Sequence, residues 1–147
     1  MNTQIVTKLK INKPAQDVFE AIVSPAEIGN FWFSSCSERW EKGKRIVLRY
    51  DEYNAEGVIH ILEMNENKSI VFTWGEEHGE GTVVSITLTE FETGTIIEVN
   101  ESGLKEDDPE IVAKMLGQKE GWVYTLTCLK GYLENGINNL RASLIHY

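Results

Sequence analysis

The sequence is poor in the residues that hold a chain together through covalent or metal bonds. It has two cysteines, three histidines and three prolines in 147 residues. Cys36 and Cys128 provide no disulfide framework, so we expect two ordinary thiols in a reducing, cytoplasmic compartment. No cysteine or histidine lies two to four residues from another, the usual spacing of paired metal ligands, so we expect no metal site.

Positive charge and long apolar runs are also scarce. Lys and Arg number 14 against 23 Asp and Glu, for a net charge of −9, which repels phosphate and anionic lipid and excludes nucleic acid as an expected partner. No apolar run approaches the ~18 residues of a membrane span, so no membrane insertion is expected. The sequence shows no repeat or linker, and we expect one domain over residues 1–147.

Familiar catalytic signatures are absent. The sequence has no G-x-S-x-G, no H-E-x-x-H and no phosphate-binding glycine loop. We therefore expect no catalytic residue and no cofactor, which favours a protein that is not an enzyme without deciding the question.

The order of elements predicts an α+β fold. Residues 4–12 alternate as a strand, Pro14 begins a helix, and Ser24–Glu27 form a capping box for a second short helix ending at 31–33. Period-two segments follow at residues 44–53, 56–64, 69–77, 81–92 and 94–102, with 75–81 as a hairpin turn and Gly94 at a turn position requiring positive φ. A long helix then runs from Pro109 to about Asn135, with residues 137–147 as a looser helical tail. We predict a curved antiparallel sheet of about six or seven strands gripping the long C-terminal helix, with two short helices after the first strand.

The long helix poses a question of its own. Trp122, Leu126, Leu129 and Leu133 recur at helical spacing, yet glycines stand at 117, 121 and 131. Each interior glycine costs a helix roughly 1 kcal/mol relative to alanine. Small residues beside large ones either bring the helix close to the sheet or leave an empty space between them.

Four stretches resemble the helix-grip (START-like, SRPBCC) superfamily. They are residues 11–33, 57–74, 82–104 and 121–136, with the marks FWF, FTW, ESGL and GW followed by spaced leucines. Within it, the chain is similar to the bacterial branch resembling the C-terminal domain of the activator of heat-shock protein 90 ATPase. The resemblance implies a cavity between the long helix and the sheet, although DEYNAE at 51–56 replaces a segment often rich in glycine and proline.

Aromatic side chains at inward positions are the best candidates for binding a ligand. By alternation we expect Tyr50, Phe72 and Trp74 on the inner face, and His60 with Val58, Leu62 and Met64. The predicted ligand-binding residues are Trp32, Phe33, Tyr50, His60, Phe72, Trp74, Trp122, Leu126 and Leu129. Polar groups expected within reach are Arg49, His60, Ser85 and Glu98.

Three functions remain open at this point. The first is non-enzymatic binding of a small hydrophobic molecule in the cavity. The second is a protein-interaction, co-chaperone-like module, although the chain lacks the N-terminal domain of the eukaryotic activator. The third is a polyketide cyclase or aromatase, for which His60, Arg49 and Glu98 are the available acid–base groups.

Overall fold

One antiparallel sheet and one long helix form the structure, a computed structural model that describes residues 1–75 and 81–145. Within these residues seven strands follow the order β1-β7-β6-β5-β4-β3-β2. The strands are β1 Ile5–Ile11, β2 Ser35–Cys36, β3 Arg45–Tyr50, β4 Ala55–Asn65, β5 Ser69–Trp74, β6 Thr82–Phe91 and β7 Gly94–Ser102. The α-helices are α1 Ala15–Val23 and α2 Ile111–Asn135, and two 3-10 turns are η1 Ile28–Asn30 and η2 Asp51–Tyr53.

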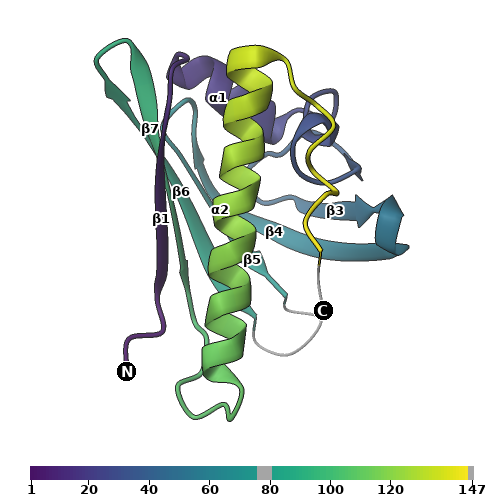
Figure 1. Cartoon of the computed structure of the whole chain (residues 1–147), viewed down its shortest axis with the longest axis vertical. Coiled ribbons are helices and arrows are strands. Elements are labelled where there is room, and N and C mark those ends of the chain that lie inside the picture. The colour runs from purple at the N-terminus through teal and green to yellow at the C-terminus, as the bar shows by residue number, and fades with distance from the viewer. Residues whose placement is uncertain (76–80, 146–147) are drawn as a thin grey trace.

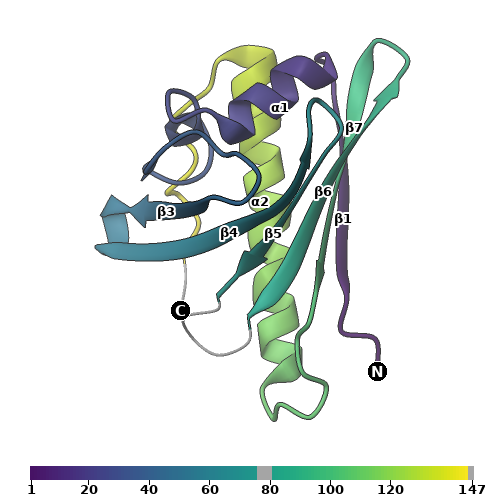
Figure 2. The same ribbon diagram turned by 180° about the vertical axis from the view of Figure 1, so that it is seen from behind.

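The long helix α2 crosses one face of the sheet, which confirms the predicted helix-grip architecture. Figure 1 shows α2 lying over the curved strands, with α1 packed at the same end as the C-terminus of α2, and Figure 2 shows the strands from behind. Apolar side chains fill the space beneath α2 near α1. The largest completely buried ones include Trp40, Phe31 and Phe72, and Leu126 and Leu129 of α2 join them. This part of the interior is solid core.

The second predicted short helix is only the 3-10 turn η1. Ser24 accepts a hydrogen bond from the Ala26 N–H at 3.3 Å, so the N-cap is partly formed. A side chain at Gly29 would lie 2.9 Å from the Ser34 carbonyl oxygen, because the chain turns back on itself there. That turn ends the helix after three residues and presents Trp32 and Phe33 to the interior.

The predicted inner face of β4 was wrong over most of its length. Ile59 and Ile61 are the buried residues, whereas His60 lies between them on the opposite face and Leu62 is 44% exposed. A bulge between Ile61 and Glu63 inserts one residue into β4, so that Met64 returns to the inner face. A strict period of two cannot represent that shift.

Gly94 serves close approach, not a positive φ as predicted. The left-handed residue of this turn is Glu92, at φ 54°, and Gly94 has no positive φ. A Cβ on Gly94 would lie 2.4 Å from the Ile11 carbonyl oxygen and 3.1 Å from the Asn12 Cα. The glycine therefore lets the β6–β7 turn pack directly on the end of β1.

Helix α2 also covers the free edge of the sheet at β1. Lys119 donates to the Val6 carbonyl oxygen at 2.6 Å, and Lys130 donates to the Lys10 carbonyl oxygen at 2.9 Å. The Asn12 N–H donates to the Glu134 carboxylate at 2.9 Å. These bonds satisfy backbone groups that an outer strand otherwise leaves open to pairing with another chain.

The predicted helical tail was wrong, because α2 ends at Gly136 in a left-handed conformation with φ 68°. Residues 137–145 instead fold back beside α2 without regular structure apart from a turn at 141–142. Tyr124 donates its hydroxyl hydrogen to the Leu140 carbonyl oxygen at 2.7 Å, and Leu140 passes over Gly131. The absence of a side chain at Gly131 leaves room for this contact.

Candidate functional site

A pocket of about 300 Å³ opens between α2 and the ends of β3 and β5. Four of its lining residues are aromatic and four are small or polar. They are Trp32, Tyr50, Trp74 and Trp122, with Gly117, Gln118, Gly121 and Thr125. The helix α2 supplies one entire wall, because five of the lining residues belong to it: Gly117, Gln118, Gly121, Trp122 and Thr125.

The aromatic wall comes from four separate parts of the chain. Tyr50 and Trp74 are the last residues of β3 and β5, and Trp32 follows η1. Phe33 holds the wall together from behind, with its ring centroid 4.6 Å from Tyr50 and 5.7 Å from Trp74. The Trp32 and Trp122 rings meet edge-on at 5.5 Å. The four rings are therefore held by contacts with Phe33 or with one another, and do not depend on a ligand for their position.

The glycines of α2 leave space and are not needed for close packing at the pocket. A Cβ built on Gly117 or Gly121 meets no atom within 4 Å. At Gly131, outside the pocket, the same Cβ would touch Leu140 and Ile137 at 3.8 and 3.9 Å. The glycines of α2 therefore have two different roles. Gly117 and Gly121 line an empty pocket, whereas Gly131 makes room for the C-terminal tail.

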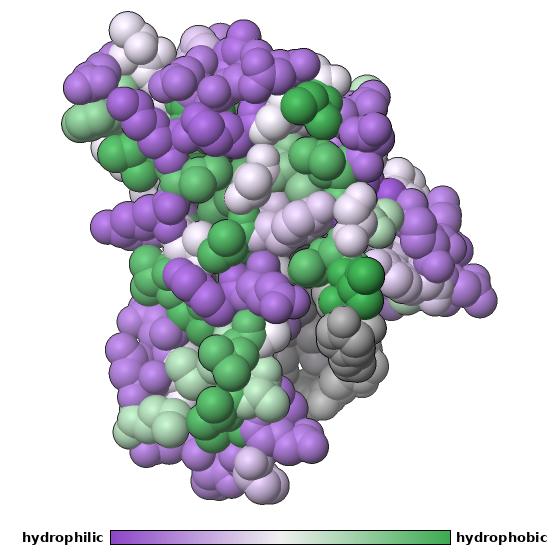
Figure 3. All heavy atoms as spheres, viewed as in Figure 1, coloured by the Kyte–Doolittle hydropathy of each residue, from purple (hydrophilic) through white to green (hydrophobic). Residues whose placement is uncertain are grey.

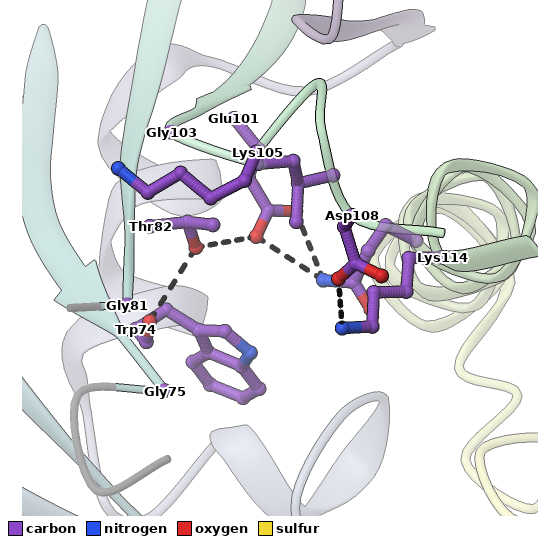
Figure 4. Close-up of a pocket in the computed structure, with 11 residues that line it drawn as sticks. Trp74, Gly75, Gly81, Thr82, Glu101, Gly103, Lys105, Asp108 and Lys114 are labelled. Carbon is purple, nitrogen blue, oxygen red and sulfur yellow. Dashed lines mark hydrogen bonds and ion pairs between the residues drawn. The ribbon is translucent and has the colours of Figure 1, made fainter. Parts of the chain in front are cut away.

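A second pocket of about 340 Å³ adjoins the first and shares Trp74 and Gln118 with it. Figure 4 shows this pocket, with the Glu101 carboxylate directed between Thr82 and the helix α2. Lys105, Asp108 and Lys114 also line this pocket, with Asp108 and Lys114 beside α2. The two pockets together form a recess along the N-terminal half of α2.

Glu101 is the most unusual residue of the recess, because it is a carboxylate with 0% exposure. It accepts hydrogen bonds from the Thr82 hydroxyl at 2.6 Å, the Trp122 indole N–H at 2.9 Å and the Gln118 amide at 3.0 and 3.1 Å. Buried polar groups need such partners to avoid a large desolvation cost. The carboxylate thereby fixes the orientation of Trp122 and Gln118, both of which line the first pocket.

Sequence reasoning missed Glu101 and named Glu98 in its place. Alternation along β7 contained the signal, since Glu101 shares its face with the buried Ile97 and Val99. Glu98 points to the other face, where its carboxylate pairs with Lys8 at 3.2 Å. An acidic residue at the end of an inward-facing apolar series was therefore the recognisable feature.

The structure gathers four of the nine predicted binding residues around the pocket: Trp32, Tyr50, Trp74 and Trp122. Phe33, Phe72, Leu126 and Leu129 are buried and belong to the core behind it. His60 lies on the outer face of the sheet, paired in register with Arg45 and Thr73.

The other polar residues expected near the ligand also lie elsewhere. Arg49 binds Glu56 at 2.7 Å and Asp51 at 3.3 Å on the exposed side of β3. Ser85 stands in register with Val71 and Asn100, on the same face as Glu98 and away from the pocket. The acid–base groups required by the cyclase interpretation are thus not brought together.

One cation, Arg141 of the tail, reaches the rim of the pocket. Its guanidinium donates to the Trp32 carbonyl oxygen at 2.7 Å and to Glu52, and lies 5.7 Å from the Tyr50 ring centroid. Hydrogen bonds from Arg141 lower the pKa of the Glu52 carboxyl to about 2. Burial raises the pKa of the Tyr50 hydroxyl to about 12, so Tyr50 stays neutral at physiological pH. Arg141 therefore fastens the C-terminal segment beside the aromatic wall.

A metal site, a reactive thiol and a membrane-spanning helix each require particular features of the described residues. Among residues 1–75 and 81–145, no three His, Cys, Asp or Glu side chains group as metal ligands. Burial raises the pKa of both the Cys36 and the Cys128 thiol, which disfavours the reactive thiolate. Over the same residues, no helix is both long enough and apolar enough to cross a membrane.

A helix gripped by a curved antiparallel sheet, with a recess between them, defines a helix-grip domain. The family model described as "Activator of Hsp90 ATPase homolog 1-like protein" matches residues 12–134. The chain belongs to this family. No curated protein sequence is similar enough to the chain to count as a relative.

Solved structures share this fold. The crystal structure of protein SSP2350 from Staphylococcus saprophyticus is similar at 47% identity and a TM-score of 0.83, over 95% of this chain and 97% of that one. The Aha1 dimer from Colwellia psychrerythraea is similar at 20% identity and a TM-score of 0.79, over 90% of this chain and 97% of that one. CalU16 from Micromonospora echinospora is similar at 17% identity and a TM-score of 0.74, over 90% of this chain and 76% of that one. The last two share the fold alone.

Proposed function

We propose that the protein binds a small, largely apolar molecule in the aromatic pocket and does not transform it. The observation that carries this proposal is the combination of a preformed aromatic wall with Gly117 and Gly121, whose missing side chains keep the pocket open. Ligand pockets in proteins are typically lined by aromatic and apolar side chains with a few placed polar groups. Gln118, Thr125 and, behind Trp122, Glu101 provide the polar groups here.

The dimensions limit the ligand. A volume of about 300 Å³ is at the small end of the range for ligand sites, roughly 300–1,000 Å³. The adjoining pocket behind Gln118 would extend the space for a longer molecule. The expected ligand is therefore compact, such as one or two fused rings.

Filling the pocket tests the proposal. Native mass spectrometry of the purified protein, followed by tryptophan fluorescence titration with small aromatic compounds, identifies ligands. Gly121→Leu should abolish their binding, because its side chain enters the pocket. Ala113→Leu creates the same side chain, with one carbon fewer added, on the exposed side of the same helix and should leave binding unchanged. Equal affinity in both variants would show that ligands bind elsewhere, and binding of no compound would remove the proposal.

A second candidate, protein interaction, is supported by an exposed apolar row on α2. Val112, Leu116 and Val123 are 58%, 66% and 43% exposed. Figure 3 shows hydrophobic side chains along the outward face of this helix. Beside the row, the N-terminal Met1 and Val6 of β1 complete an apolar groove of about 530 Å³. Contiguous exposed patches of this kind mark interaction sites in soluble proteins.

We take a second copy of the chain as the occupant of this row. The similar Colwellia structure is described as a dimer. Two antiparallel α2 helices related by a twofold axis between residues 119 and 120 would place Leu116 against Val123 of the other copy, and Lys119 against Glu120. Sedimentation velocity of Leu116→Glu tests this, since it should convert dimer to monomer while Ala113→Glu does not. A monomeric unaltered protein would reject it.

A further inference from the structure

The recess contains a buried carboxylate, Glu101, that forms no ion pair with a cation of the described residues. The side chains that contact the Glu101 carboxylate are Thr82, Gln118 and Trp122, all of them neutral. The Trp122 indole donates its N–H to one carboxylate oxygen, and the Gln118 amide donates to both. Low polarity around a buried charge leaves its field poorly screened. The whole chain adds to that field, with a net charge of −9.

Positive groups near the recess are directed elsewhere. Lys114 pairs with Asp108, and Arg141 pairs with Glu52 at the far, Tyr50 side of the pocket. Figure 4 shows the Lys105 side chain extending away from the Glu101 carboxylate. Arg141 already lies over the Tyr50 ring, so a further cation is favoured over the other lining indoles, Trp74 and Trp122.

The indoles at that end are suited to receive a cation. Trp is the best side chain for cation–π attraction, and desolvated sites strengthen it. Trp122 is only 7% exposed and donates its N–H to Glu101, which shifts electron density into the ring that lines the pocket. A ligand cation there would contact the aromatic rings, and the Glu101 carboxylate would lie behind the Trp122 ring to which it is hydrogen-bonded.

We propose that the pocket selects ligands in which a cationic nitrogen, a protonated or quaternary amine, is joined to a compact apolar body. This rests on the proposed ligand-binding function and specifies its ligand class. The nitrogen lies between Trp74 and Trp122, and the apolar body extends toward Trp32 and the space over Gly121.

Gln118 adjusts this recognition. Its amide contacts both oxygens of Glu101, and the residue lines both pockets, so it lies between the carboxylate and the open space of the aromatic pocket. A ligand ammonium with hydrogens to donate takes over the position of the Gln118 amide. A quaternary nitrogen, which donates none, leaves Gln118 in place and is held by the rings and the charge.

A pair of isosteric probes tests the charge preference alone. Phenyltrimethylammonium and tert-butylbenzene have the same shape and differ in one positive charge. Each is titrated into the ¹⁵N-labelled protein while the indole N–H signals of the four tryptophans are followed by NMR. The cation should bind at least about tenfold more tightly, and the Trp74 and Trp122 signals should move most.

The outcomes separate this inference from the proposed function. Equal or tighter binding of the neutral probe would overturn the cation preference and leave ligand binding intact. Binding of neither probe would overturn both. Saturable binding of the cation without any shift of the Trp74 or Trp122 signal would place it at the acidic surface and also reject the inference.

A charge-removing variant identifies the carboxylate responsible. Glu101→Gln keeps the shape of the side chain, although it replaces one acceptor oxygen by an N–H donor. The variant should reduce the preference to less than about threefold while the neutral probe binds as before. Glu98→Gln makes the same change in net charge on the opposite face of the sheet and should retain the full preference. An unchanged preference in Glu101→Gln would reject the role of Glu101. The comparison of probes on the unaltered protein remains decisive if Glu101→Gln does not fold.

Discussion

Replacing Gly121 by alanine should make the protein more stable, contrary to the usual effect of changes at a buried helix–sheet boundary. Alanine is favoured over glycine in a helix interior by about 0.8–1.0 kcal/mol. No atom lies within 4 Å of the added Cβ, so no steric cost offsets that gain. We therefore expect the free energy of unfolding to rise by about 1 kcal/mol.

Thermal unfolding converts this figure into a measurable shift. With an unfolding entropy of about 2.1 cal/mol/K per residue, a chain of 147 residues gains about 3 °C in Tm per kcal/mol. Circular dichroism at 222 nm follows the transition, and urea denaturation gives the free energy with an unchanged m value.

Two comparisons make the test decisive. Gly131→Ala should give a similar gain, since its Cβ makes only ordinary contacts with Leu140 and Ile137, but it should not alter ligand binding because it lies outside the pocket. Gly121→Ala should weaken binding, since it reduces the volume over which a ligand lies. A loss of about 1 kcal/mol or more in Gly121→Ala would mean that the helix and sheet are in close contact there, and would refute the reasoning on which the pocket depends.

Further predictions concern individual contacts. Gly94→Ala should lower the free energy of unfolding by more than about 2 kcal/mol in urea denaturation, because its Cβ would overlap the Ile11 carbonyl; a loss under 1 kcal/mol contradicts the close approach. Trp122→Phe retains most of the ring but withdraws a donor from buried Glu101, and should cost about 1.5–3 kcal/mol by the same measurement, whereas a neutral result would show that the bond is dispensable. Arg141→Gln should return the pKa of Glu52 from about 2 toward its ordinary value of 4.5 in an NMR carboxyl titration. Because that pKa is lowered in the folded protein, the pair stabilises the fold fully above about pH 4.5, and this stabilisation is lost as the pH falls toward 2. The free energies of unfolding of the variant and the unaltered protein should therefore differ least at the acid end. A Glu52 pKa near 2 in the variant would contradict this account.

The architecture could be predicted from sequence because it depends on periodicity and on strong boundary signals. Alternation marked the long strands, and the left-handed Gly136 ends α2 where the sequence placed its stop. The aromatic wall was recoverable for the same reason, since Tyr50 and Trp74 are inward residues of regularly alternating strands.

The errors arise where a local event depends on a distant partner. The bulge in β4 reversed the face of His60, and nothing in that segment alone specifies an extra residue. The tail leaves helical structure because Tyr124 and Arg141 bind it to groups far along the chain. Glu101 was overlooked because an acidic residue in a strand normally faces solvent, and its three donors come from β6 and α2.

The capping of β1 by Lys119, Lys130 and Glu134 bears on how this molecule meets its neighbours at high concentration. The opposite margin, β2, is only two residues long. Neither end of the sheet thus offers an extended ladder for an incoming strand, so fibre-like growth through main-chain pairing is disfavoured. Contacts between copies must therefore be made by surface side chains. Substituting these side chains can change the solubility of the protein without disturbing its fold.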